Sequence, residues 1–465
     1  MKEEIFSYTK RLEKRLTQDE SAPLTLTTAL FFIWGFITAM NGILLPKLQE
    51  VFKLDQFHTE LVNLSFFGAY FLIGILYLVI SSIFVDPVLR FGYKKTIIGG
   101  LIISAIGCGL FYPAAEQQQY NIFLVALFVL ASGIAILQIV ANPYSARLGH
   151  EETAASRLNL SQAFNSLGTT IAPYAGGLLI HDIGLGTSSV ESVKLPYLTL
   201  SVVLFLLAIL ISMAHLPDIK YKQVAQKNLL KHRHLMLGAI GIFMYVGAEV
   251  SIGYHLPQFI EEAAFDNEFK SPIGPYLSLY WGGAMIGRFM GAIFMSRALK
   301  TSKAGLSLFV LGGAFLLGWA MTSNFEGAFI FACISTLSFL TLLLTKPLAS
   351  KLLGVFAGIV IILLALVVST TGYLALWSII AIGLFNSIIF NNLFTLSLQR
   401  LGDLTTKASS LLIVAIVGGG IMPFAQDFLS DYVGLQDSFL FPMISYLYIM
   451  FYAFFWSKVR QDKVL

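Results

Sequence analysis

Apolar runs of about twenty residues recur along the whole sequence, separated by short polar segments. An α-helix of that length crosses the hydrocarbon core of a bilayer, which is about 30 Å thick. Hydrophobic residues make up 57% of the chain and charged residues only 12%. The pattern therefore predicts an all-α polytopic membrane protein in contact with the lipid bilayer.

We predict fourteen membrane-spanning helices. Their ranges are 24–46, 60–84, 96–113, 122–146, 158–180, 196–215, 235–260, 276–295, 304–321, 327–344, 352–370, 375–398, 408–429 and 439–456. The longest hydrophilic connection, 216–234, separates an N-terminal bundle, 24–215, from a C-terminal bundle, 235–457. Segments 1–23 and 458–465 are the predicted tails. The charged N-terminus lacks the apolar core of a signal peptide, so we expect the first span to be retained.

The basic residues predict the orientation in the membrane. Lys and Arg accumulate in the short cytoplasmic loops of membrane proteins. With the N-terminus inside, 25 of the 30 basic residues fall in inside segments. The exceptions are Lys47, Lys53, Lys194 and Lys270 in outside loops and Arg288 within a span. We therefore expect both termini to be cytoplasmic.

Composition and spacing argue against several functions. The net charge of +4 is small and no basic cluster has interleaved aromatics, so we expect no nucleic-acid partner. Cys108 and Cys333 lie in separate apolar runs, which argues against a disulfide framework or a metal knuckle. No carboxylate pair, metal-ligand spacing or nucleophile with a base indicates catalysis. We expect no enzymatic activity and no cofactor, and we expect a monomer.

Amides and aromatics within the N-terminal spans are candidates for binding a polar substrate. Polar side chains are costly in a bilayer core, so we expect them to face a bundle interior or a water-filled cavity. The candidates are Trp34, Asn41, Gln138, Gln162 and Asn165. Amides bond to sugar hydroxyls, while an aromatic face covers the C–H side of a sugar ring. The alternative is that such amides join neighbouring helices, which we favour for Asn142 and Asn159.

The C-terminal half supplies one acid and further polar residues. Glu249 is the acid in the middle of its span, where an unpaired carboxyl costs at least about 2.5 kcal/mol. It can carry a proton, bind a sodium ion or hydrogen-bond a sugar; the structural alternative is an ion pair with Arg288. Trp281, Asn386 and Asn391 complete the candidate substrate-binding residues. We expect His255, near a helix end, to be an interfacial residue.

The two halves resemble each other weakly. Arg147-Leu148-Gly149 ends the fourth span and Arg400-Leu401-Gly402 ends the twelfth, and glycines with a proline follow within the next helix in both cases. Secondary transporters build midplane sites between two such repeats. The alternative explanation is that Gly and Pro are frequent in membrane helices generally.

Several longer strings carry a resemblance to a known family. They are ILQIVANPYSARLG at 136–149, SRLNLSQAFNSLGTTIAP at 156–173, YVGAEVSIG at 245–253, IGRFMG at 286–291, FNSII and FTLSL within 385–398, and GGGIMP at 418–423. Together they resemble the glucose/galactose branch of the fucose/proton symporter family, within the major facilitator superfamily. The resemblance implies two six-helix bundles and alternating-access sugar transport across a bacterial inner membrane, usually coupled to a cation. It also implies that Gln162 and Asn165 line the sugar cavity and that Glu249 is the acid of this branch.

The sequence departs from that family at positions that matter for coupling. Asn41-Gly42 stands where the family usually has Asn-Asp, and Gln138 stands where the fucose symporter has a glutamate, although Gln is usual there in the glucose/galactose branch. Neither position can therefore take up a proton. Coupling then depends on Glu249, depends on a sodium ion held by neutral oxygens and one carboxylate, or is absent. Asn391-Asn392 stands where the family tends to have Pro-Thr, which is expected to change the sugar that fits.

The resemblance also locates two extra spans, because the superfamily usually has twelve. We assign the inserted pair to about 304–344, since its removal restores the family's order and an even insertion keeps later loops on their sides. Its few polar residues predict a peripheral position. As a whole, the sequence predicts a transporter that takes up a hexose or related monosaccharide with Na⁺ or H⁺. The alternatives are an uncoupled uniporter, a drug or metabolite exporter, and a sugar sensor.

Overall fold

The computed structural model describes residues 22–40, 44–45, 48–49, 51–177, 190–217, 229–262, 273–345 and 348–457. Every regular element in these ranges is a helix, which confirms the predicted all-α class. Twelve helices in the described ranges are long and apolar enough to cross a membrane. Two others, α5 (Ala154–Gly177) and α8 (Ile273–Met295), have 24 and 23 residues and are not among these twelve. The total of fourteen spans and the cytoplasmic termini stay predictions.

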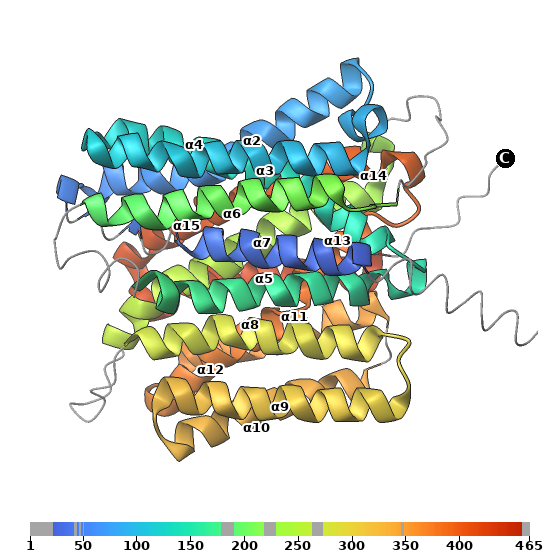
Figure 1. The fold of residues 1–465 in the computed structure, drawn as a ribbon. Helices are drawn as coiled ribbons and strands as arrows, with labels where there is room; N and C mark the ends of the chain where they lie inside the picture. Colours follow the sequence, from blue (N-terminus) through green and yellow to red (C-terminus); the bar gives the residue numbers. More distant parts are fainter. Residues whose placement is uncertain are drawn as a thin grey trace, which may run out of the picture.

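The N-terminal bundle packs around α3 and α4. Its members are the helix Ala22–Met40, α2 (Gln56–Ile83), α3 (Pro87–Glu116), α4 (Tyr120–Arg147), α5 and α6 (Lys194–Met213). α3 packs against both α4 and α6, and α2 packs against α4 (Figure 1). Outside the spans, Asp55 begins α2 by accepting from the His58 backbone N–H at 2.8 Å. That bond and the His58 ring lower the pKa of the Asp55 carboxyl, because both favour its charged form.

The C-terminal bundle contains interrupted helices. Its members are α7 (Arg233–Glu262), α8, α11 (Ala349–Ser369), α12 (Gly372–Asn386), α13 (Ile389–Ser397), α14 (Thr405–Val414), α15 (Gly418–Val433), α16 (Leu435–Ser438) and α17 (Leu440–Phe451). The predicted span 375–398 is therefore two helices, α12 and α13, with a break between them. The predicted span 408–429 is likewise divided into α14 and α15, with a 3₁₀ turn between them. Such breaks free backbone carbonyls within the membrane segment.

The two helices predicted to be an inserted pair lie at one edge of the molecule. α9 (Lys300–Thr322) and α10 (Phe325–Leu344) pack against each other and against α8, and α10 also reaches α12 (Figure 1). Large apolar side chains on the pair, such as Phe309 and Leu344, are exposed. An exposed apolar face of this kind suits contact with lipid.

The first helix and α5 approach each other through glycines. A Cβ atom on Gly168 would lie 2.3 Å from the Phe32 carbonyl oxygen. We therefore expect Gly168→Ala to push the two helices apart and to destabilise the protein by about 1–3 kcal/mol. Thermal unfolding in detergent measures the change, with Gly99→Ala as the control because a Cβ there meets no atom within 4 Å. Equal melting temperatures for the two variants would contradict this close approach.

The two bundles are joined at one end, which we call the basic end and define by Arg90, Arg147, Arg297, Lys300 and Arg400. There Arg147 of α4 donates from Nη2 to the Gly402 carbonyl and to Thr405 Oγ1, both at 2.8 Å. Thr406 donates to Asp86 Oδ2 at 2.8 Å. Ser156 of α5 donates to the Ala292 carbonyl of α8 at 2.7 Å, and Arg297 pairs with Glu152. This end of the structure is closed between the bundles.

Candidate functional site

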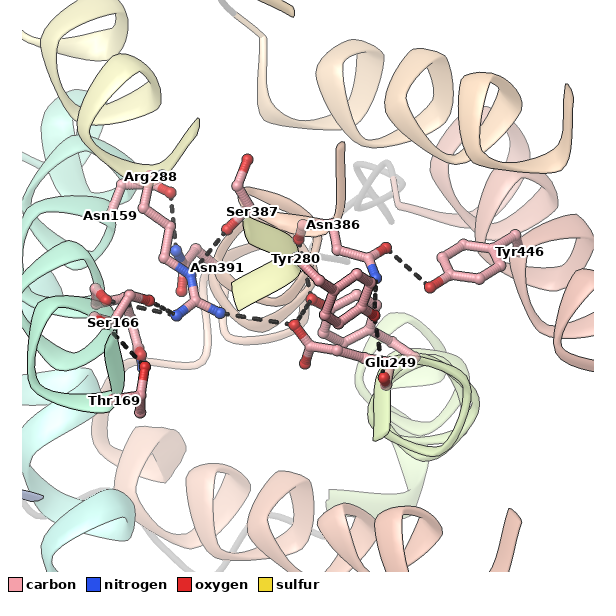
Figure 2. Close-up of polar contacts among 12 residues, drawn as sticks. Asn159, Ser166, Thr169, Glu249, Tyr280, Arg288, Asn386, Ser387, Asn391 and Tyr446 are labelled. Carbon is pink, nitrogen blue, oxygen red and sulfur yellow. Dashed lines mark hydrogen bonds and ion pairs between the residues drawn. The ribbon is translucent and has the colours of Figure 1, made fainter. Parts of the chain in front are cut away.

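Arg288 of α8 lies at the centre of a polar cluster between the bundles (Figure 2). Its Nε donates to the Ser387 carbonyl at 3.2 Å. Its Nη1 donates to Ser166 Oγ and lies 3.5 Å from the Gln162 carbonyl, both on α5. The guanidinium therefore bridges the two bundles.

Glu249 of α7 faces this arginine from the C-terminal bundle. The distance from Arg288 Nη2 to Glu249 Oε1 is 3.8 Å, and the two side chains are 11% and 12% exposed. A charge-assisted hydrogen bond is shorter, about 2.7–2.9 Å. The shorter contact of the carboxyl is with the Tyr245 hydroxyl, 2.8 Å from the same oxygen. The ion pair considered from the sequence is thus present, but it is a long one.

Two buried tyrosines hold Asn386 beside Glu249. Tyr446 of α17 donates to Asn386 Oδ1 at 2.8 Å, and Asn386 Nδ2 donates to the Tyr280 hydroxyl at 3.3 Å. Tyr280 in turn donates to the backbone carbonyl of Glu249 at 3.1 Å. The polar atoms of the Asn386 side chain are therefore engaged within the C-terminal bundle (Figure 2).

Three of the predicted amides of the N-terminal half, those within the described residues, have a protein partner. Gln162 Nε2 donates to Asn142 Oδ1 at 3.3 Å, across α4 and α5. Gln138 Nε2 donates to the Tyr70 hydroxyl at 3.0 Å. Asn165 Nδ2 donates to the Phe31 carbonyl of the first helix at 3.0 Å. Of the three, Gln162 is the one that also contacts Arg288.

One amide pair crosses between the bundles. Asn391 Nδ2 on α13 donates to Asn159 Oδ1 on α5 at 2.7 Å, and both side chains are fully buried. Asn159 also donates to the Ala155 carbonyl of its own helix at 2.8 Å. Asn159 therefore does join helices, as we favoured, and it does so across the interface between the two bundles.

Several buried polar atoms of α4, of α13 and of the break between α12 and α13 have no hydrogen-bond partner within the described residues. They are Asn142 Nδ2, Ser387 Oγ, Asn391 Oδ1 and both polar atoms of the Asn392 side chain. A buried polar group without a partner costs about 1–3 kcal/mol. These atoms can hydrogen-bond to a polar ligand that enters between the bundles.

Other predicted site residues lie apart from the cluster. Trp34 is buried among apolar residues of the N-terminal bundle, including Leu101, Ile134 and Leu204. Trp281 is half-buried and packs edge-on against Tyr280, with ring centroids 5.1 Å apart. Asn41 is outside the described residues.

The expectation that His255 is interfacial was wrong, because its side chain is buried at 1% exposure. Its Nδ1 lies 2.8 Å from the Ser251 carbonyl, and its Nε2 lies 3.7 Å from Asp427 Oδ1 of α15. The position near a helix end indicated an interface, but α15 covers this side of α7.

Sequence reasoning missed three residues that contact the cluster. Ser166 lies four residues after Gln162, so helical spacing could have found it. Tyr280 and Tyr446 come from separate helices, and no spacing relates either of them to Glu249 or Asn386. Only the packing of α8 and α17 against α7 brings them together.

The space that the structure leaves for ligands is small. A cavity of about 40 Å³ lies between α2, α7 and α15, lined by residues such as Asn63, Phe67 and Tyr254, whereas pockets for small molecules are typically about 300–1,000 Å³. No group of three or more His, Cys, Asp or Glu side chains that could hold a metal ion occurs in the part of the chain that the structure describes.

Two helical bundles, interrupted helices and a polar cluster between the bundles define a secondary transporter of the major facilitator type. The sequence profile of the Major Facilitator Superfamily matches residues 26–353. The chain belongs to this superfamily, whose members are transporters rather than enzymes. Within the superfamily it belongs to the glucose/galactose branch, as the sequence motifs indicated.

Curated relatives match along almost the whole chain. The glucose/galactose transporter of Brucella abortus is 41% identical over 443 residues, 94% of each chain. The putative glucose/galactose transporter of Helicobacter pylori is 37% identical, over 94% of this chain and 97% of that one. The L-fucose-proton symporter of Escherichia coli is 28% identical, over 95% and 94%.

A solved structure has the same fold. The crystal structure of the E. coli fucose:proton symporter in the outward conformation superposes with a TM-score of 0.72, at 27% identity and over 93% of this chain and 98% of that chain. The predicted major facilitator fold is thereby confirmed.

Proposed function

We propose that this protein takes up a hexose or a related monosaccharide by cation symport with alternating access, and that the cation is a proton. The observation that carries the proposal is the polar cluster between the bundles in a chain 41% identical to a glucose/galactose transporter. Buried amides and hydroxyls from both bundles meet there around one acid and one arginine. Such a set matches the hydroxyl groups of a sugar.

The sugar is proposed to bind between α5 and the break of α12 and α13. Gln162 is proposed to lie on one side of the sugar, and Ser387, Asn391 and Asn392 on the other. Their side chains have polar atoms that lack a partner or that can exchange a present hydrogen bond for one to the sugar. Gln138, Asn165 and Asn386 support this site through the contacts described above. Trp281 offers the aromatic face, while Trp34 is left out of the proposed site because it lies among apolar side chains.

Glu249 is the proposed coupling residue. Its position in a membrane-spanning helix makes a permanently charged carboxyl costly. The guanidinium of Arg288, 3.8 Å from the carboxyl, opposes any added positive charge beside Glu249, whether a proton or a sodium ion, so it does not choose between the two cations. Among the relatives, the E. coli protein is named a proton symporter.

The alternating states are proposed to differ at the basic end. Its loops carry the basic residues that accumulate on the cytoplasmic side, so we place this end and both termini in the cytoplasm of a bacterial inner membrane. The structure then corresponds to a state closed to the cytoplasm. Its similarity to a transporter solved in the outward conformation supports this assignment.

Uptake by the purified protein in proteoliposomes tests the proposal. A panel of labelled sugars is offered with an imposed pH gradient, an imposed sodium gradient, or neither. We expect one or more hexoses to accumulate above the external concentration with the pH gradient alone. Equilibration that ignores both gradients would identify a uniporter, sodium-driven accumulation would reassign the cation, and no uptake of any sugar would overturn the proposal.

Removing the Gln162 side chain is expected to weaken sugar binding. Gln162→Ala removes an amide of the proposed site, and losing one hydrogen bond to a buried polar group costs about 1–3 kcal/mol, or about fivefold to a hundredfold in affinity. The half-saturating sugar concentration in an exchange assay measures the effect. Gln399→Ala, at an exposed position, is the matched control. Unchanged affinity would assign Gln162 to helix packing.

A further inference from the structure

The break between α12 and α13 exposes two consecutive backbone carbonyls. α12 ends at Asn386 and α13 begins at Ile389, and carbonyls at a helix end have no partner in that helix. Both find donors on other helices: the Tyr245 hydroxyl lies 2.9 Å from the Asn386 carbonyl oxygen, and Arg288 Nε donates to the Ser387 carbonyl at 3.2 Å. Side chains of α7 and α8 therefore hold the break in place.

The same two donors are the partners of Glu249. Its Oε1 lies 2.8 Å from the Tyr245 hydroxyl and 3.8 Å from Arg288 Nη2. Glu249 and the break therefore share Tyr245 and Arg288. A change in the charge of Glu249 therefore changes how strongly its carboxyl attracts the Tyr245 hydroxyl and the Arg288 guanidinium.

The protonation state of Glu249 decides where the single hydrogen of Tyr245 goes. When Glu249 is ionised, the charge-assisted bond to the carboxylate is the stronger one, and the Asn386 carbonyl loses its donor. When Glu249 is protonated, its own hydroxyl donates to the Tyr245 oxygen, and Tyr245 donates to the Asn386 carbonyl. When Glu249 is protonated, the Tyr245 hydroxyl therefore makes both hydrogen bonds at once, to Glu249 and to the Asn386 carbonyl, at the observed 2.8 and 2.9 Å.

The break also positions the contact between the bundles. Asn391 lies on the first turn of α13, four residues after Ser387, and donates to Asn159 across the interface at 2.7 Å. A shift of the break moves α13, and with it this amide pair near the basic end.

We propose that Tyr245 is a positioning residue that transmits the protonation of Glu249 to the break between α12 and α13. Protonated Glu249 favours the conformation in which the basic end is closed, and ionised Glu249 favours its opening. This inference rests on the coupling role proposed above for Glu249 and names the side chain through which that role reaches the helices.

Titratable and charged groups face Glu249 from several helices. Among the described residues, α7 contributes Tyr245, α8 contributes Arg288 and Tyr280, and α17 contributes Tyr446, while α12 and α13 present amides and hydroxyls. Further along α7, His255 lies beside Asp427 of α15. An imidazole is the side chain that ordinarily titrates nearest to neutral pH. The test therefore includes Glu249→Gln, which removes the titration of Glu249 but leaves His255 able to titrate, so the two groups are told apart.

The test measures the distance across the basic end as a function of pH. Spin labels are attached to the full-length protein after His150→Cys and Leu299→Cys, two exposed positions on opposite sides of the bundle interface. The background carries Cys333→Ser, because Cys333 is exposed whereas Cys108 is buried. Pulsed electron resonance gives the fractions of short and long distances. In this parent we expect the ratio of short to long to fall about threefold to tenfold between about pH 5 and about pH 9, the change that one hydrogen bond produces.

Three variants decide the inference. Glu249→Gln should keep the short distance at all pH values, because its amide can donate to the Tyr245 oxygen as a protonated acid does. Tyr245→Phe should lose the pH dependence. Tyr448→Phe is the matched control: it also removes a tyrosine hydroxyl that bonds to α7, at the Leu237 carbonyl 2.8 Å away, but one that lies apart from Glu249 and the break, and it should keep the parent's pH dependence.

The outcomes separate this inference from the proposed function. A parent whose distances ignore pH would overturn the inference, as would a Tyr245→Phe variant that responds like the parent. Equal loss in Tyr245→Phe and Tyr448→Phe would also overturn it, since the effect would then follow from the loss of any tyrosine hydroxyl that bonds to α7. These distances need no sugar, so failure to find a transported sugar overturns the proposed function without altering them.

Discussion

Replacing Glu249 by glutamine is expected to abolish sugar accumulation against a gradient while leaving exchange of sugar across the membrane. Glutamine keeps the size and hydrogen-bonding of the protonated acid but cannot release a proton, so the transport cycle no longer carries one. Exchange needs only the sugar-loaded states and does not require deprotonation. Counterflow of labelled sugar and uptake driven by a pH gradient measure the two activities in the same proteoliposomes.

Asp427→Asn is the matched control for this variant. It also converts a carboxylate beside α7 into an amide, but at a carboxylate that lies next to His255. We expect it to retain accumulation. Full accumulation by Glu249→Gln would return Glu249 to a purely structural role as the partner of Arg288 and Tyr245.

Replacing Arg288 by methionine is expected to remove transport and to destabilise the protein. The change leaves Glu249 without its cationic partner at 12% exposure and removes the contacts of Arg288 with Ser166, Gln162 and Ser387. Breaking a buried pair by removing one partner costs about 3–5 kcal/mol, and the long 3.8 Å separation places this pair at the lower end. Thermal unfolding in detergent measures the loss.

The double variant Glu249→Gln with Arg288→Met separates charge from packing. It removes both charges, so we expect it to be more stable than Arg288→Met alone. A double variant as unstable as the single one would show that the contacts of Arg288 with α5 and the break, and not its pairing with Glu249, account for the loss.

The sequence was sufficient to predict the helices and the family, because span length, apolar composition and long motif strings are local properties. It also singled out Glu249 and Gln162, which the structure places in the polar cluster, since a carboxyl or an amide at membrane depth stands out against apolar neighbours; their roles stay predictions. The break at Asn386 was not predicted. No proline or glycine marks residues 386–389, and the break depends on donors from Tyr245 and Arg288 on other helices.

Helix rotation explains why other site predictions did not come together. Trp34, Thr38 and Asn41 share one face by spacing, but spacing alone does not say which neighbours that face meets after the helices pack. In the structure Trp34 packs among apolar residues, and Thr38 donates to the Trp34 carbonyl of its own helix at 3.0 Å. The tyrosines around Asn386 could not be placed for a related reason: tertiary packing of α8 and α17 decides their direction.

The contacts that close the basic end differ in their response to ionic strength. The outermost, Arg297 with Glu152, joins side chains that are 55% and 80% exposed, so dissolved salt screens it and it contributes little. The inner contact, Asn391 with Asn159, is fully buried and carries no net charge. This inner contact is therefore beyond the reach of counterions, and it should persist in cells whose internal salt concentration changes with their surroundings.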